Sequence, residues 1–334
     1  MPIQTNKEYK SVLSVHETQL AIAVVKKMFE EKLSKALNLT RVSAPLFVDA
    51  STGLNDNLNG VERPVSFDIP SCGRSAEIVH SLAKWKRVAL LKYGFPPGTG
   101  LYTDMNAIRR DEVVDNIHSV YVDQWDWERI INPGERNIDF LKYAVQLIAD
   151  ALCATNLAVI KRFPVLKGRI KRKVTFVTSQ ELEDQYPALA PAKREEVFAR
   201  KYRTVFVTQI GGKLKSGVRH DGRAPDYDDW ALNGDLLVWN DALGRAFELS
   251  SMGIRVDPES LSRQLEISGN ADRLSLDYHK MLMAGALPQT IGGGIGQSRV
   301  CMLLLQKMHI GEVQVSLWDE ETLTESKKSG IYLL

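Results

Sequence analysis

The first clear pattern along the chain is an apolar stripe with helical spacing. Ser14 and Glu17 have the spacing of a capping box, in which each side chain satisfies a backbone N–H of the other residue. The apolar residues that follow recur every three or four positions: Leu20, Val24, Val25, Met28, Phe29 and Leu33. We therefore predict a long amphipathic helix that ends near Asn38. Residues 41–48 are apolar and β-branched but include Pro45, which predicts a strand at an edge or an interface.

Later segments predict both helices and strands. Helical patterns cover residues 139–161, 192–201, 260–268, 273–284 and 300–307, and strand-like runs cover residues 174–177, 204–209, 236–239 and 247–249. Residues 101–128 mix strand-like pieces, such as 118–122, with many charged residues, and their pattern is weak. Several strands follow one another without a helix between them. We therefore predict an α+β fold, with a mostly antiparallel sheet flanked by helices, in a single domain over residues 1–334.

The composition is that of an ordinary globular protein. Of the 334 residues, 44% are hydrophobic and 25% are charged, which provides enough apolar material for a large core. The 43 basic residues nearly balance the 41 acidic residues, so the net charge of +2 does not favour a nucleic-acid or membrane partner. The polar start of the chain and the shortness of the apolar run 300–305 predict a cytoplasmic location.

The cysteines and histidines exclude several kinds of site. Cys72, Cys153 and Cys301 are widely spaced and odd in number, which argues against a disulfide framework or a CxxC metal site, and we expect buried, reduced thiols. The six histidines show no HxxxH spacing, and the chain has no GxSxG motif. Zinc catalysis and a serine nucleophile therefore have little support.

The sharpest local feature is the glycine cluster in residues 291–299, which read IGGGIGQSR. A dinucleotide-binding fingerprint that starts at Gly294 would need glycine where Arg299 stands, and neither GxxxxGKS nor GxxxxGKT occurs in the chain. Two interpretations remain with about equal weight. One is a glycine platform beneath an adenine ring, with Arg299 at the start of a helix to pair with a phosphate; the other is a glycine-rich turn with a surface arginine.

Two acids and an arginine favour the nucleotide interpretation. Asp235 and Glu248 lie on strand-like runs that adjacent strands would bring together, and Arg255 follows on the second run. Carboxylate oxygens suit Mg²⁺, which bridges proteins to nucleotide phosphates while it keeps most of its waters. Taken alone, two solvent-facing carboxylates would be the simpler explanation.

Further candidates lie in residues 109–128. Arg109 follows a predicted strand and is suited to an α-phosphate, although Arg109 and its charged neighbours would equally suit a solvated turn. In the run VDQWDWE, residues 122–128, Gln124 and Asp126 share one face of an alternating strand. That face would cradle an ammonium group, while the two tryptophans would face the core.

Two segments nearer the start of the chain have both structural and functional interpretations. Residues 80–87, HSLAKWKR, form a basic cluster so short that a solvated face is more common than a nucleic-acid site, and Lys86 would alternatively neutralise a substrate carboxylate. Residues 56–60, DNLNG, read first as a turn in which asparagine and glycine take left-handed conformations. Only its context makes Asp56 a catalytic candidate.

In their order along the chain, these features resemble the three motifs of the class II aminoacyl-tRNA synthetase catalytic fold. The helix and strand up to Pro45 resemble the dimer-interface motif, Arg109 with Asp111 resembles the second motif, and residues 292–299 resemble the third. The strings at 80–87, 118–128, 223–230 and 288–299 are similar to those of the ammonia-dependent asparagine synthetase family, and the resemblance covers essentially the whole chain. One departure is the short stretch 230–232, where that family has a longer loop.

This resemblance implies an adenylating ligase. The side-chain carboxylate of aspartate attacks ATP to give β-aspartyl-adenylate and pyrophosphate, and ammonia then displaces AMP to give asparagine. The implied ligands are ATP, aspartate, ammonia and Mg²⁺, and the implied assembly is a homodimer. The implied catalytic residues are Arg109 and Arg299 at the phosphates and Asp56, which attracts ammonium and accepts its proton.

The resemblance also implies roles for the other candidates. The nucleotide would be bound by Arg109, Asp235, Glu248, Ser251, Gly294 and Arg299, with Asp235 and Glu248 also holding Mg²⁺. Aspartate would be bound by Ser81 and Lys86 at its side-chain end, by Gln124 and Asp126 at its α-amino group, and by Arg255 at a carboxylate.

Two other functions remain open. An aspartyl- or asparaginyl-tRNA synthetase-like enzyme would share the adenylation chemistry but would need a separate RNA-binding surface, and no additional basic domain is evident. A regulatory homologue would keep the fold without the activity, which the presence of Arg109, Asp235, Glu248 and Arg299 disfavours. Pro2 stands where a glutamine-dependent synthetase would expose a cysteine nucleophile, so glutamine should be a poor nitrogen donor.

Overall fold

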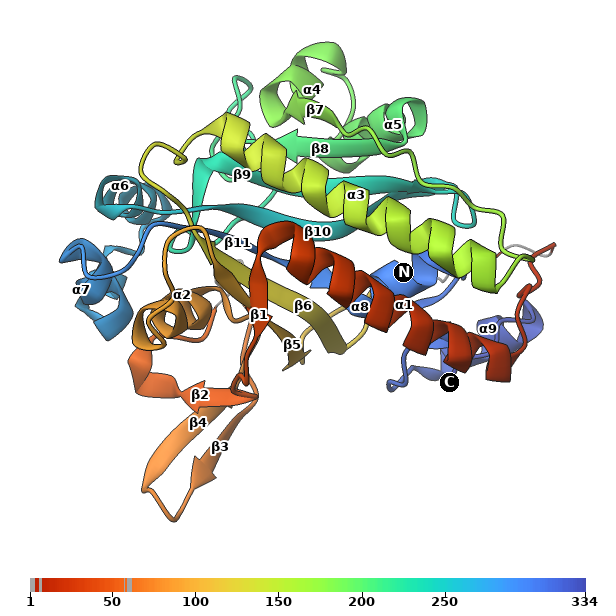
Figure 1. The fold of residues 1–334 in the computed structure, drawn as a ribbon, viewed down its shortest axis with the longest axis horizontal. Coiled ribbons are helices and arrows are strands. Elements are labelled where there is room, and N and C mark those ends of the chain that lie inside the picture. The colour runs from red at the N-terminus through yellow and green to blue at the C-terminus, as the bar shows by residue number, and fades with distance from the viewer. Residues whose placement is uncertain (1–3, 6–7, 57, 59–61) are drawn as a thin grey trace.

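The computed structural model describes residues 4–5, 8–56, 58 and 62–334 (Figure 1). In this part of the chain an eight-stranded sheet has the order β1 (Leu39–Arg41), β5 (Gly100–Ile108), β6 (Tyr121–Ile130), β11 (Thr290–Gly296), β10 (Arg245–Arg255), β9 (Asp228–Asn240), β8 (Thr204–Thr208) and β7 (Thr175–Thr178). β1 pairs parallel with β5, and β7 pairs parallel with β8, whereas the five central pairings are antiparallel. The predicted α+β fold with a mostly antiparallel sheet is confirmed.

The first helix, α1 (Val15–Leu37), begins where its capping box predicts. The Ser14 side chain accepts from the backbone N–H of Glu17, and the Glu17 carboxylate accepts from the backbone N–H of Ser14 at 2.9 Å. Asn38 ends the helix in the left-handed conformation, with φ at 56°, which a short amide side chain tolerates. The buried stripe has four-residue spacing and consists of Ala21, Val25, Phe29, Leu33 and Leu37, whereas Leu20 is exposed.

One face of the sheet is covered by long helices. Here α1 lies beside α3 (Ile138–Arg162) and α8 (Gln297–Leu304), and the main core fills the space between these helices and the strands (Figure 1). Phe29 and Trp125 meet in this core with ring centroids 4.7 Å apart. By length and composition alone α3 could cross a membrane, but 56% of its most apolar window is buried, as is usual for the core helix of a globular protein.

The opposite face carries α2 (Ala83–Lys92). Leu101 of β5 packs with Ala89 and Leu90 of α2, whereas its neighbour Tyr102 belongs to the main core. Because successive side chains of a strand point to opposite faces, α2 and the long helices lie on opposite sides of β5. The remaining helices are α4 (Ser179–Gln185), α5 (Pro191–Tyr202), α6 (Pro258–Ser268), α7 (Asp277–Met283) and α9 (Glu320–Lys328), with 3₁₀ turns η1 (Ala50–Thr52), η2 (Ala271–Ser275) and η3 (Ile310–Glu312).

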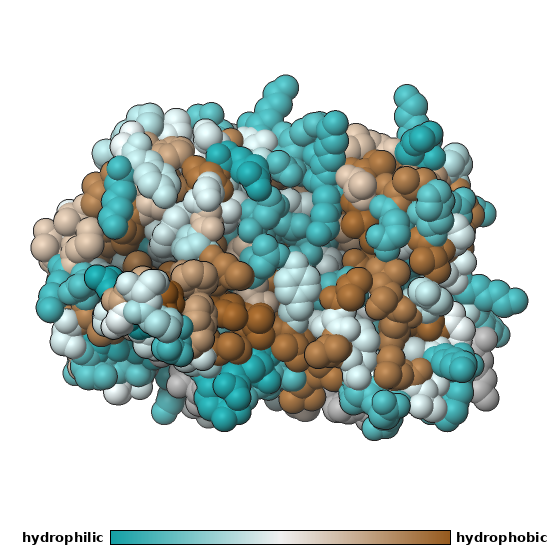
Figure 2. All heavy atoms as spheres, turned by 90° about the horizontal axis from the view of Figure 1, so that it is seen from below, coloured by the Kyte–Doolittle hydropathy of each residue, from teal (hydrophilic) through white to brown (hydrophobic). Residues whose placement is uncertain are grey.

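A small sheet projects from this body as an arm (Figure 1). It contains β2 (Phe47–Asp49), β4 (Arg74–Ile78) and β3 (Ser66–Ile69), all paired antiparallel. Phe47 and Phe67 are exposed on it, with ring centroids 5.2 Å apart. Figure 2 shows the side of the molecule on which the arm projects, where hydrophobic patches alternate with hydrophilic ones.

Most predicted elements are confirmed. The helices expected at 139–161, 192–201 and 260–268 are α3, α5 and α6, and the four later strand-like runs fall in β7 to β10. The helix expected at 300–307 is α8, which begins and ends three residues earlier. The stretch 230–232, where the resembled family has a longer loop, lies inside the continuous strand β9.

Four predictions of local structure are wrong. Residues 41–48 are not one strand, because β1 ends at Arg41 and β2 begins at Phe47, with Pro45 between them. Residues 273–284 are divided between η2 and α7. Residues 80–87 are not a solvated face, because residues 80–82 and the first turns of α2 that follow them are largely buried. Of the three cysteines, Cys153 and Cys301 are buried as predicted, but Cys72 is exposed on the arm.

Candidate active site

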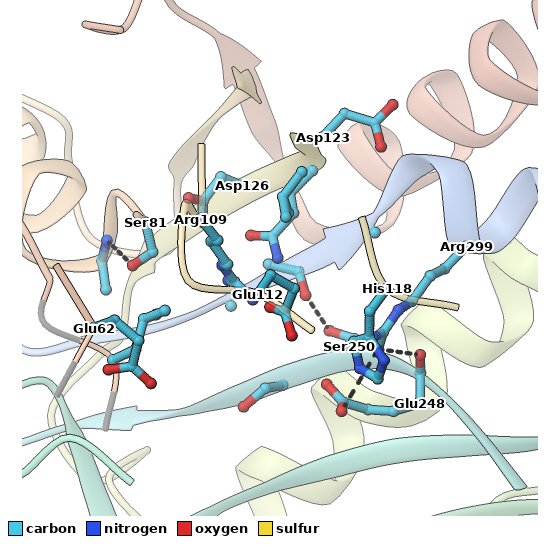
Figure 3. A pocket seen from close by; sticks show the side chains of 18 of the residues that line it. Glu62, Ser81, Arg109, Glu112, His118, Asp123, Asp126, Glu248, Ser250 and Arg299 are labelled. Carbon is cyan, nitrogen blue, oxygen red and sulfur yellow. Dashed lines mark hydrogen bonds and ion pairs between the residues drawn. The ribbon is translucent and has the colours of Figure 1, made fainter. Parts of the chain in front are cut away.

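A pocket of about 390 Å³ opens on the face of the sheet that carries α2. Its floor comes from β6, β11 and β10, and its walls come from the first turns of α2 and α8 and from segments 109–119 and 221–228. Figure 3 shows side chains from several of these elements pointing toward the same space, including Ser81, Arg109, Asp126, Glu248 and Arg299. The volume of the pocket is within the range of small-molecule sites, and its lining includes many charged side chains.

One row of paired residues starts at this floor and crosses four strands, and its last member, Asp235 of β9, does not itself line the pocket. Asp126 of β6 pairs with Gly294 of β11, Gly294 pairs with Ser251 of β10, and Ser251 pairs with Asp235 of β9. Residues that pair directly across a sheet point to the same face. Four of the residues predicted for the site are therefore neighbours, and β9 and β10, which carry the two predicted acids, are adjacent strands as expected.

The alternation predicted for residues 122–128 is confirmed. Gln124 and Asp126 line the pocket, whereas the two tryptophans of this run are fully buried in the main core. Gly294 makes room for the Gln124 side chain, because a Cβ at Gly294 would collide with its amide. The glycine cluster is therefore a strand that leaves space for neighbouring side chains, and its interpretation as a turn is wrong.

Arg255, at the end of β10, is held by two buried carboxylates. Its Nε and Nη2 donate to Glu128 at 2.9 and 2.6 Å, and its Nη1 donates to Asp228. Burial disfavours the charge on Arg255, but the two acids outweigh burial and raise the pKa of the guanidinium. A guanidinium has five N–H groups, so two remain for a further acceptor. Arg255 lines the pocket, as its predicted role requires.

Lys86 also lines the pocket, but its ammonium group is already saturated. It donates to the Asp126 carboxylate, to the carbonyl of Trp127 at 2.9 Å and to the carbonyl of Gly293 at 3.1 Å. An ammonium group has three N–H donors, so these contacts use all of them. In this arrangement Lys86 orients Asp126 and joins β6 to β11, and it would act on a substrate carboxylate through its charge.

Arg109 and Arg299 bring two positive charges to the pocket (Figure 3). Arg109 follows β5 as predicted, and burial, reinforced by the like charge of Arg299, lowers its pKa. Its Nε is buried without a hydrogen-bond partner in the described part of the chain. Arg299 lies in the first turn of α8, with its Nη1 3.6 Å from the Glu248 carboxylate. Two guanidinium groups at one site favour an anion that carries several charges, such as a polyphosphate.

The two predicted metal ligands are placed differently. Glu248 lines the pocket, and although burial raises its pKa, the charges of Arg299 and Arg223 outweigh this and lower it. Asp235 accepts from Arg223, and burial raises its pKa to about 7. The other oxygen of Asp235, Oδ1, is buried without a hydrogen-bond partner among the described residues. An unsatisfied carboxylate oxygen beside a second carboxylate suits Mg²⁺, which needs only one or two protein carboxylates besides phosphate and water.

Asp56 lies behind the pocket wall. Ser81 lines the pocket and donates to the Asp56 carboxylate, which also accepts from the backbone N–H of Ala83 at 3.1 Å. Asp56 is fully buried, and burial raises its pKa to about 6. Residues 57, 59 and 60 of the predicted turn lie outside the described residues, as does Pro2. Asp56 therefore reaches the pocket through Ser81.

Sequence reasoning assigned no role to three residues of this site. Arg223 pairs with Asp235 and lines the pocket, and Glu128 and Asp228 hold Arg255. All three belong to strings that carry the family resemblance. They could have been found by asking which residues neutralise the predicted site residues, because a buried acid or arginine requires a partner of opposite charge.

Comparison with known proteins gives a consistent picture. Residues 16–330 match the family described as aspartate-ammonia ligase. The aspartate–ammonia ligase of Clostridium perfringens is 56% identical over 329 residues, covering 98% of each chain. That of Lactobacillus johnsonii is 55% identical over 330 residues, again covering 98% of each chain.

Solved structures of similar fold are class II synthetases. Asparaginyl-tRNA synthetase from Pyrococcus horikoshii, complexed with asparaginyl-adenylate, has a TM-score of 0.66 at 14% identity and covers 91% of this chain and 70% of its own. Aspartyl tRNA synthetase from Entamoeba histolytica has a TM-score of 0.59 at 17% identity, with coverage of 91% and 58%. At these identities the likeness establishes the fold alone, and it confirms the predicted class II synthetase-like catalytic fold.

Proposed function

Because this chain belongs to the aspartate–ammonia ligase family, we propose that the pocket on its sheet is the place where aspartate is activated by ATP and then aminated. The chain is an ATP-dependent ligase that forms asparagine from aspartate and ammonia through a β-aspartyl-adenylate, releasing AMP and pyrophosphate. The observation that carries the placement is the row of Asp126, Gly294 and Ser251 beside the paired cations Arg109 and Arg299.

Aspartate would be held at the β6 side of the pocket. Asp126 and Gln124 offer a carboxylate and an amide oxygen to its α-ammonium group. Arg255 offers its two remaining N–H donors to a carboxylate, and Glu128 and Asp228 fix the plane of its guanidinium. A guanidinium that is already oriented loses little conformational entropy when it binds, which favours recognition of one geometry.

The phosphates of ATP would lie against Arg109 and Arg299. When an oxygen of the aspartate side chain attacks the α-phosphorus, the bond to pyrophosphate breaks and negative charge grows on the phosphate oxygens. Positive groups fixed in a partly buried site stabilise that charge without reorganisation at the moment of reaction. Ser251 and Gly294 would lie against the rest of the nucleotide.

We further propose Mg²⁺ as the ion that accompanies ATP. Asp235 and Glu248 would hold it, because the free Oδ1 of Asp235 and the Glu248 carboxylate are adjacent hard donors. The bound ion would neutralise phosphate charge. The part these side chains play is to fix its place beside Arg223 and Arg299.

Amination would take place at the Ser81 end of the pocket. Asp56 accepts a proton from ammonium, and the freed ammonia attacks the acyl carbon of the adenylate. The bond between that carbon and the AMP oxygen then breaks, and one further proton is lost to water. Ser81 lines the pocket and donates to Asp56, so its hydroxyl would link the base to the incoming nitrogen.

Aspartate-dependent exchange of labelled pyrophosphate into ATP, together with the formation of asparagine, tests this assignment. With aspartate and Mg²⁺ we expect rapid aspartate-dependent exchange of pyrophosphate into ATP, with asparagine formed only when ammonium is added. EDTA should stop the exchange, and added Mg²⁺ should restore it. Glutamine should replace ammonium poorly. Asparagine made from glutamine as fast as from ammonium would contradict the ammonia-dependent assignment.

The alternative is an enzyme that transfers aspartate or asparagine to tRNA. This alternative is supported by the fold that the chain shares with the aspartyl- and asparaginyl-tRNA synthetases. A shared fold does not by itself imply a shared function. Incubation with labelled aspartate, ATP and tRNA distinguishes the two functions. Labelled tRNA would favour the alternative, whereas free asparagine in the presence of ammonium would favour the ligase.

We propose that residues 1–334 form one catalytic domain that works in the cytoplasm as a homodimer. Around Pro45, Leu46 and Phe47 are 49% and 43% exposed, and Phe67 beside them is 37% exposed. Apolar side chains grouped on a projecting arm are typical of a surface that a partner covers. Sedimentation at micromolar concentration should give twice the mass of one chain, and Phe47→Asp should weaken the association, whereas a single-chain mass for the unaltered protein would contradict the homodimer.

A further inference from the structure

A buried network of charges lies behind the pocket wall. The Nζ of Lys84 in α2 is 3.7 Å from the Asp56 carboxylate and 3.6 Å from the Asp226 carboxylate. Asp226 is also 3.1 Å from Nε2 of His279 in α7 and accepts from Arg273 in η2 at 3.0 Å. Lys84, Asp56, Asp226 and His279 are each at most 3% exposed, and neither Lys84 nor Asp226 lines the pocket.

The two acids beside Lys84 depend on its charge to different degrees. Asp226 has two further partners from η2 and α7, and although burial raises its pKa, Lys84, His279 and Arg273 outweigh burial and hold it well below the ordinary value. Asp56 has Lys84 as its ion-pair partner, and its Oδ1 accepts no hydrogen bond in the described part of the chain. Burial raises the pKa of Asp56 to about 6, the charge of Lys84 opposes this rise, and the charge of Asp226 adds to it.

We propose that Lys84 and Asp226 are positioning residues that together set the ionisation of Asp56 during amination. This inference rests on the proposed role of Asp56 as the group that accepts the ammonium proton. A base at this step must be an anion before it takes the proton, yet it must be basic enough to take it. Lys84 provides the positive charge that keeps a buried carboxylate ionised. Asp226 draws part of that charge away and so keeps Asp56 basic.

Two further titratable groups beside Asp56 contribute no charge near neutral pH. His80 precedes α2, and its Nδ1 lies 3.1 Å from the backbone carbonyl of Asp56. Burial lowers the pKa of His80, so it is neutral near pH 7. The phenol of Tyr227 is also close enough to sense Asp56, and burial raises its pKa, so it stays protonated. Of the four groups Lys84, Asp226, His80 and Tyr227, Lys84 and Asp226 are thus the two that act on Asp56 as charges.

Substitutions at the two positions should move the pH profile of amination in opposite directions. The adenylate is formed first, and ammonium is then added in a single turnover over a range of pH. In the unaltered enzyme the rate should fall as pH drops through about 6, because Asp56 becomes protonated. Lys84→Met should move this acid limb to higher pH by about 1 unit or more, since an opposite charge is lost. Asp226→Asn should move the acid limb to lower pH, since a like charge is lost and Lys84 can then pair with Asp56 alone.

Matched variants separate this effect from simple damage. Lys84→Arg keeps the charge and should leave the acid limb close to that of the unaltered enzyme, and Lys92→Met, at the exposed end of α2, should change nothing. Pyrophosphate exchange should stay within about threefold in every variant, because adenylation does not require the Asp56 anion. A purely structural role would lower both activities and leave the position of the limb unchanged.

Asp56→Asn distinguishes failure of this inference from failure of the proposed function. That variant should keep pyrophosphate exchange and lose amination, and amination at the unaltered rate would overturn the role of Asp56 itself. If amination is lost in Asp56→Asn but Lys84→Met and Asp226→Asn both keep the original acid limb, or move it in the same direction, the inference is overturned and the role of Asp56 stands. Should Lys84→Met fail to fold, Asp226→Asn alone decides by the direction of its shift.

Discussion

Replacement of Arg299 by alanine is expected to slow aspartate-dependent pyrophosphate exchange by at least about 100-fold, the loss usually seen when one preorganised group that stabilises transition-state charge is removed. Arg299 carries one of the two guanidinium groups proposed to bind the phosphates, and its Nη1 donates to the backbone carbonyl of Glu248 at 3.0 Å. Without it, Arg109 would face the phosphates alone, and Glu248 would lose the cation that contributes most to lowering its pKa.

Two matched variants test the cause of that loss. Arg299→Lys keeps the positive charge but loses the planar pair of donors, so it should recover only part of the rate. Arg245→Ala, at the start of β10 and outside the pocket, should exchange pyrophosphate at the unaltered rate. Thermal unfolding of all three should show that the fold persists. Nearly unaltered exchange by Arg299→Ala would remove Arg299 from the proposed site.

Replacement of Arg255 by methionine is expected to lower the free energy of unfolding by about 3 to 5 kcal/mol, the range found when one partner of a buried ion pair is removed. The substitution leaves Glu128 and Asp228, which are at most 2% exposed, without their common cation. Urea unfolding followed by tryptophan fluorescence measures the change. Protein concentration must be equal for both proteins, because association contributes to apparent stability.

A double variant shows whether unpaired charge is the reason. Arg255→Met together with Glu128→Gln removes one of the stranded carboxylates, and it should be more stable than Arg255→Met alone. If the double variant is no more stable than the single one, lost packing rather than charge explains the effect. Both variants should bind aspartate poorly, because the two N–H donors that Arg255 keeps for a substrate are gone.

The parts of the fold that follow from local rules were predictable from the sequence. The capping box at Ser14 and Glu17 predicted the start of α1, and the alternation in β6 predicted which side chains line the pocket. Asp126, Gly294 and Asp235 were singled out from different motifs, and Ser251 was implied by the family resemblance. Their arrangement in one row depends on the pairing of four strands, three of them distant from β6 in the sequence. No local pattern contains that information.

The missed parts have a common physical cause. Residues 80–87 looked solvated because lysine and arginine are normally exposed, but Lys84, Lys86 and Arg87 are each at most 3% exposed. Carboxylates and carbonyls from distant segments satisfy these cations, and one example is Arg87, which donates to the carbonyl of Pro288 at 2.8 Å. The patterns of β5 and the first part of β6 were weak because Asp104 and Asn106 in β5, and Asp123 and Gln124 in β6, interrupt the hydrophobic residues, although no residue of β5 lines the pocket.

The glycine strand β11 has a consequence for how the molecule opens. Glycine is a poor strand former, and Gly292, Gly293 and Gly294 contribute no side chains to packing. β11 nevertheless lies in the middle of the sheet, paired on both edges with β6 and β10. Its order is imposed by its neighbours, so its amide hydrogens are shielded until one of those strands separates. The segment that we propose lies against the nucleotide is thus also among the last whose amides would exchange with solvent, so a glycine-rich sequence here forms a rigid floor.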